Sequence, residues 1–370
     1  MLKKLFISAP DPSGDMYAAH LIDALHKRLP DMDISAVGGE QLRKLGVTLI
    51  AEPVFLNVVG FFESLLKLPF FISLLRKVVS YIQSWQPDVV LCIDSQGFHM
   101  PLLKKIKLFP CKKYYFIAPQ EWQWGTEQGG KKVVQLVDHI FTIFREEEAF
   151  YQNLDASTTF VGHPLLDVVH DCTSTPETTA PTIGIFPGSR KQEIKTLLPI
   201  FLKSISHIQH SYTSPIHFII SASSDEAEQL IQKLCHRYKQ FYSIQRDRFD
   251  LLSKSLFCIC ASGTITLETG LCSIPTIVCY RTHFITYLIY RMFIRKKIPY
   301  ASLTNIYLKS LVFPECLQYR CTPSTISDIA LQYLNDPSSL ERIKNELAPL
   351  REKVGEPGAI HNLTAALLAL

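Results

Sequence analysis

Phe186-Pro187-Gly188-Ser189-Arg190 is the stretch from which the fold of this chain can be read. It closes a short apolar run, residues 183–186, and opens a segment in which apolar residues recur at helical spacing. A strand that passes through a small-residue turn into a helix directs backbone N–H groups and the positive end of the helix dipole toward one point. The Arg190 guanidinium adds a fork that suits phosphate oxygens. Gly188, Ser189 and Arg190 are therefore predicted to hold an anion.

The same alternation of strand, turn and helix runs along the chain on both sides of this stretch. Helical patterns separate most of the strand-like runs, and hairpin turns are lacking. This arrangement predicts an α/β protein of the doubly wound type, with two Rossmann-like parallel-sheet domains and a ligand cleft between them. The strand-like runs are residues 4–9, 34–37, 88–93, 114–117, 140–143, 158–161, 182–186, 216–221, 256–260 and 275–278.

The domain boundaries follow from length and from one composition shift. A chain of 370 residues fits two domains. Residues 171–181 are small, polar and proline-bearing, which is typical of a linker. We predict an N-terminal domain over 1–170 and a nucleotide-binding domain over 182–350. A C-terminal helix over 351–370 is expected to pack back on the first domain or on a partner subunit.

Composition narrows the class of protein. The net charge is +4 and 47% of the residues are hydrophobic, which argues against both disorder and general nucleic-acid binding. The ten cysteines include no CxxC pair, so we expect buried free thiols in a reducing compartment and no structural metal. The N-terminus resembles a strand more than a signal peptide, and no run of eighteen apolar residues occurs, so an intracellular protein is expected.

A second small-residue loop, Ser262-Gly263-Thr264, follows another apolar strand and opens a helix that carries Glu268. Either small-residue loop alone could be an ordinary turn and helix cap. Together, on two strand ends of one sheet, they predict a nucleotide diphosphate site, with Glu268 placed to accept both ribose hydroxyls. Arg281 follows a third strand and is either a second phosphate ligand or a salt-bridge residue.

In the first domain, Asp94 ends a strongly apolar strand and is our candidate general base, because burial there would raise its pKa toward a useful value. Ser13 and Asp15 follow the first strand and either contact an acceptor or cap the next helix. Trp122 and Trp124 lie in a further strand-end loop, where they either stack on a sugar or pack the domain.

Residues 55–82 carry more apolar side chains than one helix face can hold, with cations interleaved. Phe61, Phe62, Leu65 and Leu66 are central to this segment and predict a helix that enters a membrane surface or binds acyl chains. The alternative is a fully buried helix. Residues 283–297 repeat the same character and end in cations that anionic headgroups would attract.

Taken in order, these motifs resemble the lipid-A-disaccharide synthase family, an inverting glycosyltransferase family of the GT-B type. The resemblance extends over nearly the whole chain, and the ordered set is far more specific than any single motif. The matching motifs are Ser13-Gly14-Asp15, Pro87-Asp88-Val89, Ile93-Asp94, Ala118-Pro119 with Trp122 and Trp124, Phe160-Val161-Gly162-His163, Phe186 to Arg190, Ser262-Gly263-Thr264 with Leu267-Glu268, Tyr280-Arg281, Ser302-Leu303 with Asn305, and Pro314-Glu315 with Leu317-Gln318.

The resemblance implies that UDP-2,3-diacylglucosamine donates its sugar to the 6-hydroxyl of 2,3-diacylglucosamine 1-phosphate (lipid X). It implies no cofactor and no metal, and peripheral attachment at the cytoplasmic face of the bacterial inner membrane. Asp94 would be the base and Arg190 a ligand of the UDP phosphates. Ser13, Asp15, Trp122 and His163 would lie on the acceptor side. A homodimer stays open, and no nucleic acid is expected as a partner.

The chain departs from the usual family pattern mainly on the acceptor side. Pro10-Asp11-Pro12 stands for Gly-Glu-Thr, and Ser95 to His99 stand for Ala-Pro-Asp-Phe-Asn. Gly125 stands for Arg, and Thr304 stands for Pro. Two other readings therefore remain: another GT-B enzyme such as a UDP-sugar epimerase, or a weakly active membrane-associated binding protein with the same fold.

Overall fold

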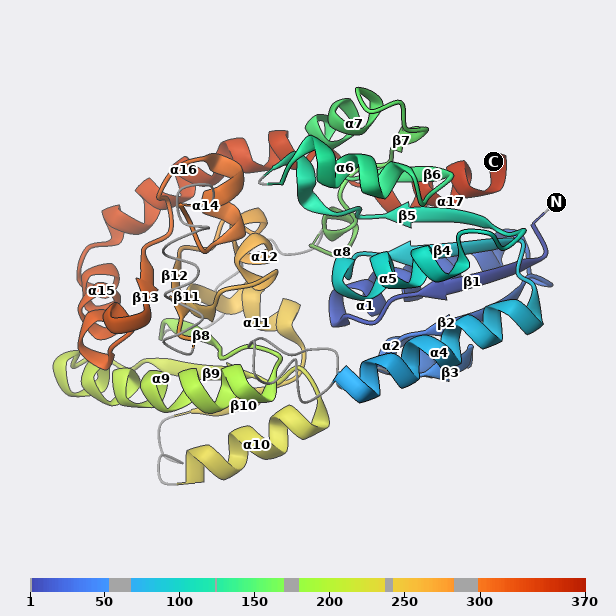
Figure 1. Cartoon of the computed structure of the whole chain (residues 1–370). Helices are drawn as coiled ribbons and strands as arrows, with labels where there is room; N and C mark the ends of the chain where they lie inside the picture. The colour runs from blue at the N-terminus through green and yellow to red at the C-terminus, as the bar shows by residue number, and fades with distance from the viewer. Residues whose placement is uncertain (1, 53–67, 124, 170–179, 237–241, 283–298) are drawn as a thin grey trace. The chain divides into compact units, whose positions relative to one another are not determined.

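The computed structural model describes residues 2–52, 68–123, 125–169, 180–236, 242–282 and 299–370 (Figure 1). The chain divides into two compact units. Unit 1 comprises Met1–Asp167 and Val354–Leu370, and unit 2 comprises Val168–Lys353. Most of the expected linker, residues 170–179, lies outside the described residues.

Unit 1 contains a seven-stranded sheet in the order β3-β2-β1-β4-β5-β6-β7, with every neighbouring pair parallel. The strand order reverses between β1 and β4. The loops that follow these two adjacent strands therefore start side by side at the carboxyl edge of the sheet and run in opposite directions. The elements are β1 (Lys4–Ser8), α1 (Pro12–Arg28), β2 (Asp33–Val37), α2 (Glu40–Lys44), β3 (Thr48–Ala51), α4 (Leu68–Trp85), β4 (Val89–Ile93), α5 (Gln96–Ile106), β5 (Lys112–Phe116), η1 (Gln120–Trp122), α6 (Glu127–Val134), β6 (His139–Thr142), α7 (Arg145–Gln152), β7 (Thr158–Phe160), α8 (Leu165–Val169) and α17 (Ala359–Ala369).

Both faces of this sheet are covered by helices, as the continuous burial of β4 requires. On one face, α4 and α5 contact each other and contribute Val78 and Leu102 to a core cluster that includes Phe6 and Val90. Elsewhere in unit 1, α1 packs against the C-terminal helix α17.

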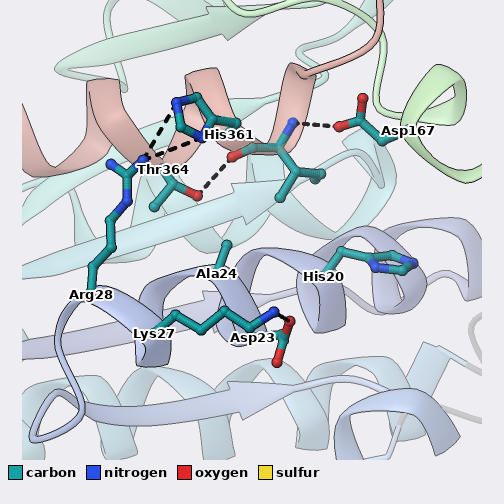
Figure 2. A pocket seen from close by; sticks show the side chains of 9 residues that line it. His20, Asp23, Ala24, Lys27, Arg28, Asp167, His361 and Thr364 are labelled. Atoms are coloured by element: carbon teal, nitrogen blue, oxygen red, sulfur yellow. Dashed lines mark hydrogen bonds and ion pairs between the residues drawn. The ribbon is translucent and has the colours of Figure 1, made fainter.

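The chain returns to unit 1 at α17, whose N-terminus is held by Asp167. The Asp167 carboxylate accepts N–H bonds from Gly358, Ala359 and Ile360, which satisfies donors that a helix start leaves unpaired. The Arg28 guanidinium at the end of α1 lies 3.3 Å from Nδ1 of His361 on α17 (Figure 2). A pocket of about 340 Å³ lies between α1 and α17 at this point.

Unit 2 contains a six-stranded sheet in the order β10-β9-β8-β11-β12-β13, again with every neighbouring pair parallel. Its order reverses between β8 and β11, which makes the loops at 187–190 and 262–264 neighbours. The elements are β8 (Thr182–Phe186), α9 (Lys191–Ser211), β9 (His217–Ser221), α10 (Asp225–Cys235), β10 (Ser243–Gln245), α11 (Arg248–Lys254), β11 (Ser255–Ala261), α12 (Ile265–Leu271), β12 (Thr276–Tyr280), α14 (Leu303–Leu308), β13 (Glu315–Leu317), η4 (Gln318–Arg320), α15 (Pro323–Asn335) and α16 (Pro337–Val354).

The predicted fold class, two doubly wound parallel-sheet units, is confirmed. Three strands were not anticipated, β3, β10 and β13, and each is a short strand at an edge of its sheet. The nine cysteines among the described residues are free and buried. In the same part of the chain, none of the helices combines the length and hydropathy needed to cross a bilayer.

Candidate active site

Asp94 lies directly after β4, at the point where the strand order of unit 1 reverses. Its backbone is left-handed, with φ of +55°, and Ser95 follows at +49°. The Asp94 N–H continues the sheet by donating to the Phe116 carbonyl at 3.0 Å. The turn therefore ends the extended path of the strand at Asp94, while the Asp94 backbone stays anchored in the sheet.

The surroundings of the Asp94 carboxyl favour its protonated form. Burial raises its pKa to about 6, and the nearby Asp11 carboxylate contributes in the same direction, while an N–H bond from Ser95 opposes them. Asp11 in turn accepts a hydrogen bond from the Ser95 hydroxyl. A carboxyl with this pKa is largely ionised at pH 7 yet basic enough to accept a substrate proton.

Asp15 has a different role from either alternative that we expected. Its buried carboxylate accepts backbone N–H bonds from Gly39 at 2.6 Å, Gln41 at 2.9 Å and Leu42 at 3.4 Å. It therefore caps α2, a different helix from the one on which it lies. Burial raises its pKa, and the three N–H bonds oppose that effect. Ser13 lies on the first turn of α1 and is half-buried.

Trp122 and His163 are brought together by Phe144, a residue that sequence reasoning missed. The Phe144 ring lies 5.5 Å from the Trp122 ring and 5.5 Å from the His163 ring, centre to centre. The Leu165 N–H donates to Nδ1 of His163, so a neutral ring carries its proton on Nε2. Burial lowers the pKa of His163 to about 3, which keeps the ring neutral.

Glu147 bonds the backbone of two loops, the one after β5 and the one after β6. The sequence did not point to this residue. This buried carboxylate of α7 accepts the Ile143 N–H at 2.8 Å. Backbone bonds from Phe144 and Ala118 also reach it, and burial raises its pKa to about 8. Nothing in the run Glu146-Glu147-Glu148 marks the middle residue as the buried one, so only the packing of α7 identifies it.

In unit 2, Arg190 is at the predicted strand end, as the N-cap residue of α9. Its guanidinium is paired with Glu193 one turn along, at 3.0 Å, and its backbone N–H donates to the same carboxylate at 3.3 Å. Gly188 has φ of +102°, and a Cβ there would lie 2.5 Å from the Glu193 carboxylate, so the turn requires glycine. Ser189 is exposed.

The second small-residue loop of unit 2, residues 262–264, is held by residues that lie later in the chain, between 301 and 315. The Ser262 hydroxyl donates to the Ala301 carbonyl at 2.6 Å. Glu315 on β13 accepts the N–H groups of Ala301 and Ser302, each at 2.9 Å. Asn305 donates to Glu315 and to the Phe313 carbonyl. These residues form a buried support for residues 262–264, and the Thr264 side chain forms no cap bond to α12 in the described structure.

Glu268 lies on α12, buried, with its carboxylate 3.0 Å from Nε of Arg248 on α11. Burial raises the pKa of Glu268 and the adjacent guanidinium lowers it. The partner Arg248 was not anticipated, because it lies twenty residues away without a local motif. Arg281 is exposed just after β12, at the same strand-end edge.

Several expectations lie outside the described residues: Phe61, Phe62, Leu65, Leu66, Trp124 and the segment 283–297. The remainder of the apolar segment forms α4. Its first turns expose Leu68 by 46%, Phe70 by 41% and Ile72 by 38%, while later turns bury Leu74 and Val78. The helix thus changes along its length from exposed apolar side chains to apolar side chains buried in the core.

Two solved structures that share this architecture illustrate the fold. UDP-GlcNAc 2-epimerase from Neisseria meningitidis, bound to UDP-GlcNAc, superposes with a TM-score of 0.65 at 14% identity over all of both chains. MurG from Acinetobacter baumannii gives a TM-score of 0.53 at 11% identity, also over all of both chains. At these identities the likeness defines the fold alone, which is that of GT-B glycosyltransferases and epimerases.

Sequence relatives define the family. Residues 5–363 match the family model described as lipid-A-disaccharide synthetase. Lipid-A-disaccharide synthase from Syntrophus aciditrophicus is 33% identical over 100% of this chain and 97% of its own. The enzyme of that name from Coxiella burnetii is 30% identical over 99% of this chain and 98% of its own. The chain therefore belongs to the lipid-A-disaccharide synthase family of glycosyltransferases, and the epimerase alternative is not favoured.

Proposed function

We propose that this protein transfers 2,3-diacylglucosamine from UDP-2,3-diacylglucosamine to the 6-hydroxyl of lipid X. The products are the β-1,6-linked disaccharide 1-phosphate and UDP. Family membership supports the reaction class. The observation that carries the residue assignment is Asp94, a carboxyl at the strand-order reversal of unit 1 with a pKa raised to about 6.

Asp94 acts as the base in this proposal. Its carboxylate removes the proton of the acceptor 6-hydroxyl as that oxygen attacks the anomeric carbon of the donor. The bond from the anomeric carbon to the diphosphate oxygen breaks, and its electron pair leaves with UDP. Attack opposite the leaving group inverts the configuration, which is consistent with a β-linked product.

The loops of unit 2 bind the donor in this proposal. Gly188, Ser189 and Arg190 bind the diphosphate at the start of α9, where backbone N–H groups and the guanidinium stabilise the negative charge that develops on departure. The loop at 262–264, supported through Ala301, completes the diphosphate site, and Arg281 contributes a further cation. Glu268, held by Arg248, accepts the ribose hydroxyls.

The acceptor is bound by unit 1. Trp122, supported by Phe144, offers a ring face to the sugar, and His163 packs edge-on against the same Phe144 ring. Ser13 contacts the acceptor from the first turn of α1. Asp15 contributes indirectly, because its carboxylate is engaged in holding the loop at Gly39.

The acyl chains require a lipid surface, and we propose that the protein is peripheral on the cytoplasmic face of the inner membrane. The support is the exposed patch of Leu68, Phe70 and Ile72 at the start of α4, with the cation Arg76 one turn further. It continues the segment that contains Phe61, Phe62, Leu65 and Leu66. The proposal includes association with a second copy of the chain as a homodimer, which the mass of the protein in solution tests.

The central experiment measures UDP release by purified protein supplied with both acylated substrates. Asp94→Asn is expected to reduce turnover by roughly 10²- to 10⁴-fold with UDP binding retained, because general-base catalysis contributes about that factor. Asp23→Asn, an exposed change on α1, is the control. Turnover of Asp94→Asn within about threefold of wild type would refute the base assignment.

The membrane proposal is tested by flotation with vesicles that contain anionic lipid. Replacing Leu68, Phe70 and Ile72 by Ser should move the protein from the vesicle fraction to the soluble fraction. Leu108→Ser, which alters a 94% exposed leucine after α5, should leave flotation unchanged. Equal flotation of the triple variant and wild type would exclude this patch as the contact.

A further inference from the structure

A fully buried histidine, His99, forms a hydrogen bond with the backbone carbonyl of Asp94. Its Nδ1 lies 2.5 Å from the Asp94 carbonyl oxygen, and its Nε2 lies 2.8 Å from Oγ of Ser8 on β1. We propose that His99 is a positioning residue for the transfer reaction, which fixes the Asp94 backbone and thereby aims its carboxylate. This inference rests on the proposed role of Asp94 as the base.

The protonation state of His99 follows from its partners. A carbonyl oxygen can only accept, so Nδ1 must carry a proton and donate to Asp94. Burial lowers the pKa of His99 to about 4, so the ring is neutral at pH 7 and Nε2 is an acceptor. The Ser8 hydroxyl therefore donates to Nε2, and a directed chain of hydrogen bonds runs from β1 through α5 to the end of β4.

The Asp94 backbone needs such support because its conformation is unfavourable. Asp94 and Ser95 are consecutive non-glycine residues with positive φ, a combination that persists only where the surroundings enforce it. The Asp94 carbonyl accepts both from His99 and from the Tyr115 hydroxyl at 2.7 Å. Together with the N–H bond to Phe116, these contacts hold the peptide groups on both sides of Asp94, while its carboxylate accepts the Ser95 N–H.

The His99 ring is itself held in place. It packs edge-on against Tyr115, with ring centres 5.6 Å apart, and against Phe98 at 5.7 Å. Each of these rings is buried, so the imidazole has little freedom to turn. A rigid donor behind the base matters because a displacement of about 1 Å at a reacting group can reduce the rate by roughly 100-fold.

His99→Leu removes the donor and keeps similar bulk. We expect kcat to fall at least about tenfold, with the KM for the UDP-sugar within about twofold of wild type. The acid limb of the pH–rate profile should move below pH 6, because a released carboxyl becomes better solvated. His99→Asn, which restores an N–H donor of shorter reach, should recover part of kcat.

The matched control is His139→Leu, a buried histidine of β6 that is bonded to Ser157 and Thr159 and does not touch Asp94. It should lower Tm without moving the acid limb. If His99→Leu behaves like this control, with kcat and acid limb unchanged, His99 is only structural and the proposal fails. Should His99→Leu not fold, Tyr115→Phe removes the other donor to the same carbonyl, and the same criteria apply.

The two proposals can fail separately. If Asp94→Asn retains turnover, the base assignment is wrong and His99 has no base to position. If Asp94→Asn is inactive while His99→Leu has the wild-type kcat and pH profile, only the positioning role is refuted.

Discussion

At the scale of single residues, the environment of Asp94 determines when it can act. Burial and the neighbouring Asp11 disfavour the charged carboxylate, and the Ser95 N–H only partly offsets them. As a result, the pKa of the Asp94 carboxyl is raised from the usual 3.8 of an aspartate to about 6. In the proposed role of general base, Asp94 would therefore become active just below neutral pH.

The first prediction concerns the pH dependence of kcat/KM. A base must be deprotonated, so kcat/KM should rise with pH and level off above about pH 6, with a slope of one proton on the acid side. UDP binding measured by calorimetry over the same range serves as the control. An acid limb near pH 4, where an ordinary aspartate titrates, would show that the titrating group is not Asp94.

In the proposed donor site, the Arg190 guanidinium is already paired with Glu193 of its own helix. Under that proposal it would exchange Glu193 for the diphosphate. We predict that Arg190→Ala weakens UDP binding by roughly 10- to 100-fold, the range of a lost charge-assisted bond, with Tm nearly unchanged. Lys191→Ala, a neighbouring change of charge, should have a smaller effect, and equal losses in both variants would point to general electrostatics.

Among the helices of unit 1, α7 holds the two loops that carry the proposed acceptor residues. Glu147 binds the ends of β5 and β6 through Ala118, Ile143 and Phe144, and the Tyr151 hydroxyl donates to the Pro119 carbonyl at 2.6 Å. A single short helix therefore fixes both loops that carry Trp122 and its supporting ring. Changes in α7 should act on the acceptor side without touching substrate.

Glu147 also makes stability depend on pH. Burial raises its pKa to about 8 in the folded protein, whereas an unfolded glutamate titrates near 4.3. Between these values the folded state binds the additional proton, so stability falls as pH rises through this window. Glu147→Gln should flatten the decline of Tm between pH 5 and 8, and Glu146→Gln, an exposed neighbour, should not. Parallel slopes in all three proteins would contradict this assignment.

At the scale of the whole molecule, the last residues of the chain complete the first unit. Helix α17 buries Ile360, Leu363 and Leu367 in unit 1. The backbone N–H groups at its N-terminus donate to the Asp167 carboxylate. Each large apolar side chain contributes about 1.5–3 kcal/mol on burial. A long stretch of sequence, the whole of unit 2, thus separates two parts of one compact unit.

Deletion of residues 354–370 should therefore destabilise unit 1 and leave unit 2 folded. We expect a thermal transition at lower temperature together with retained UDP binding, measured by calorimetry. Asp167→Asn, which weakens only the contact to the α17 N-terminus, should give a smaller shift of the same transition. An unchanged transition after the deletion would mean that α17 adds no stability to unit 1.

The fold class, the family and the strand-end position of Asp94 could be predicted because their signals are local. The central strands are continuous apolar runs, and the turns that follow them contain small residues. The edge strands β3, β10 and β13 are only partly buried, so they lack such runs and were missed.

The two parallel-sheet units, and the strand-end loops that carry the candidate residues, follow from local patterns of apolar and small residues. The partner of each buried polar side chain depends instead on the folded arrangement: Asp15 bonds the loop at Gly39, Glu268 pairs with Arg248, and His99 bonds the Asp94 carbonyl. The physical reason is that apolar periodicity acts over a few neighbouring residues. A buried polar group instead bonds whatever the fold brings within about 3 Å of it, however distant in the chain.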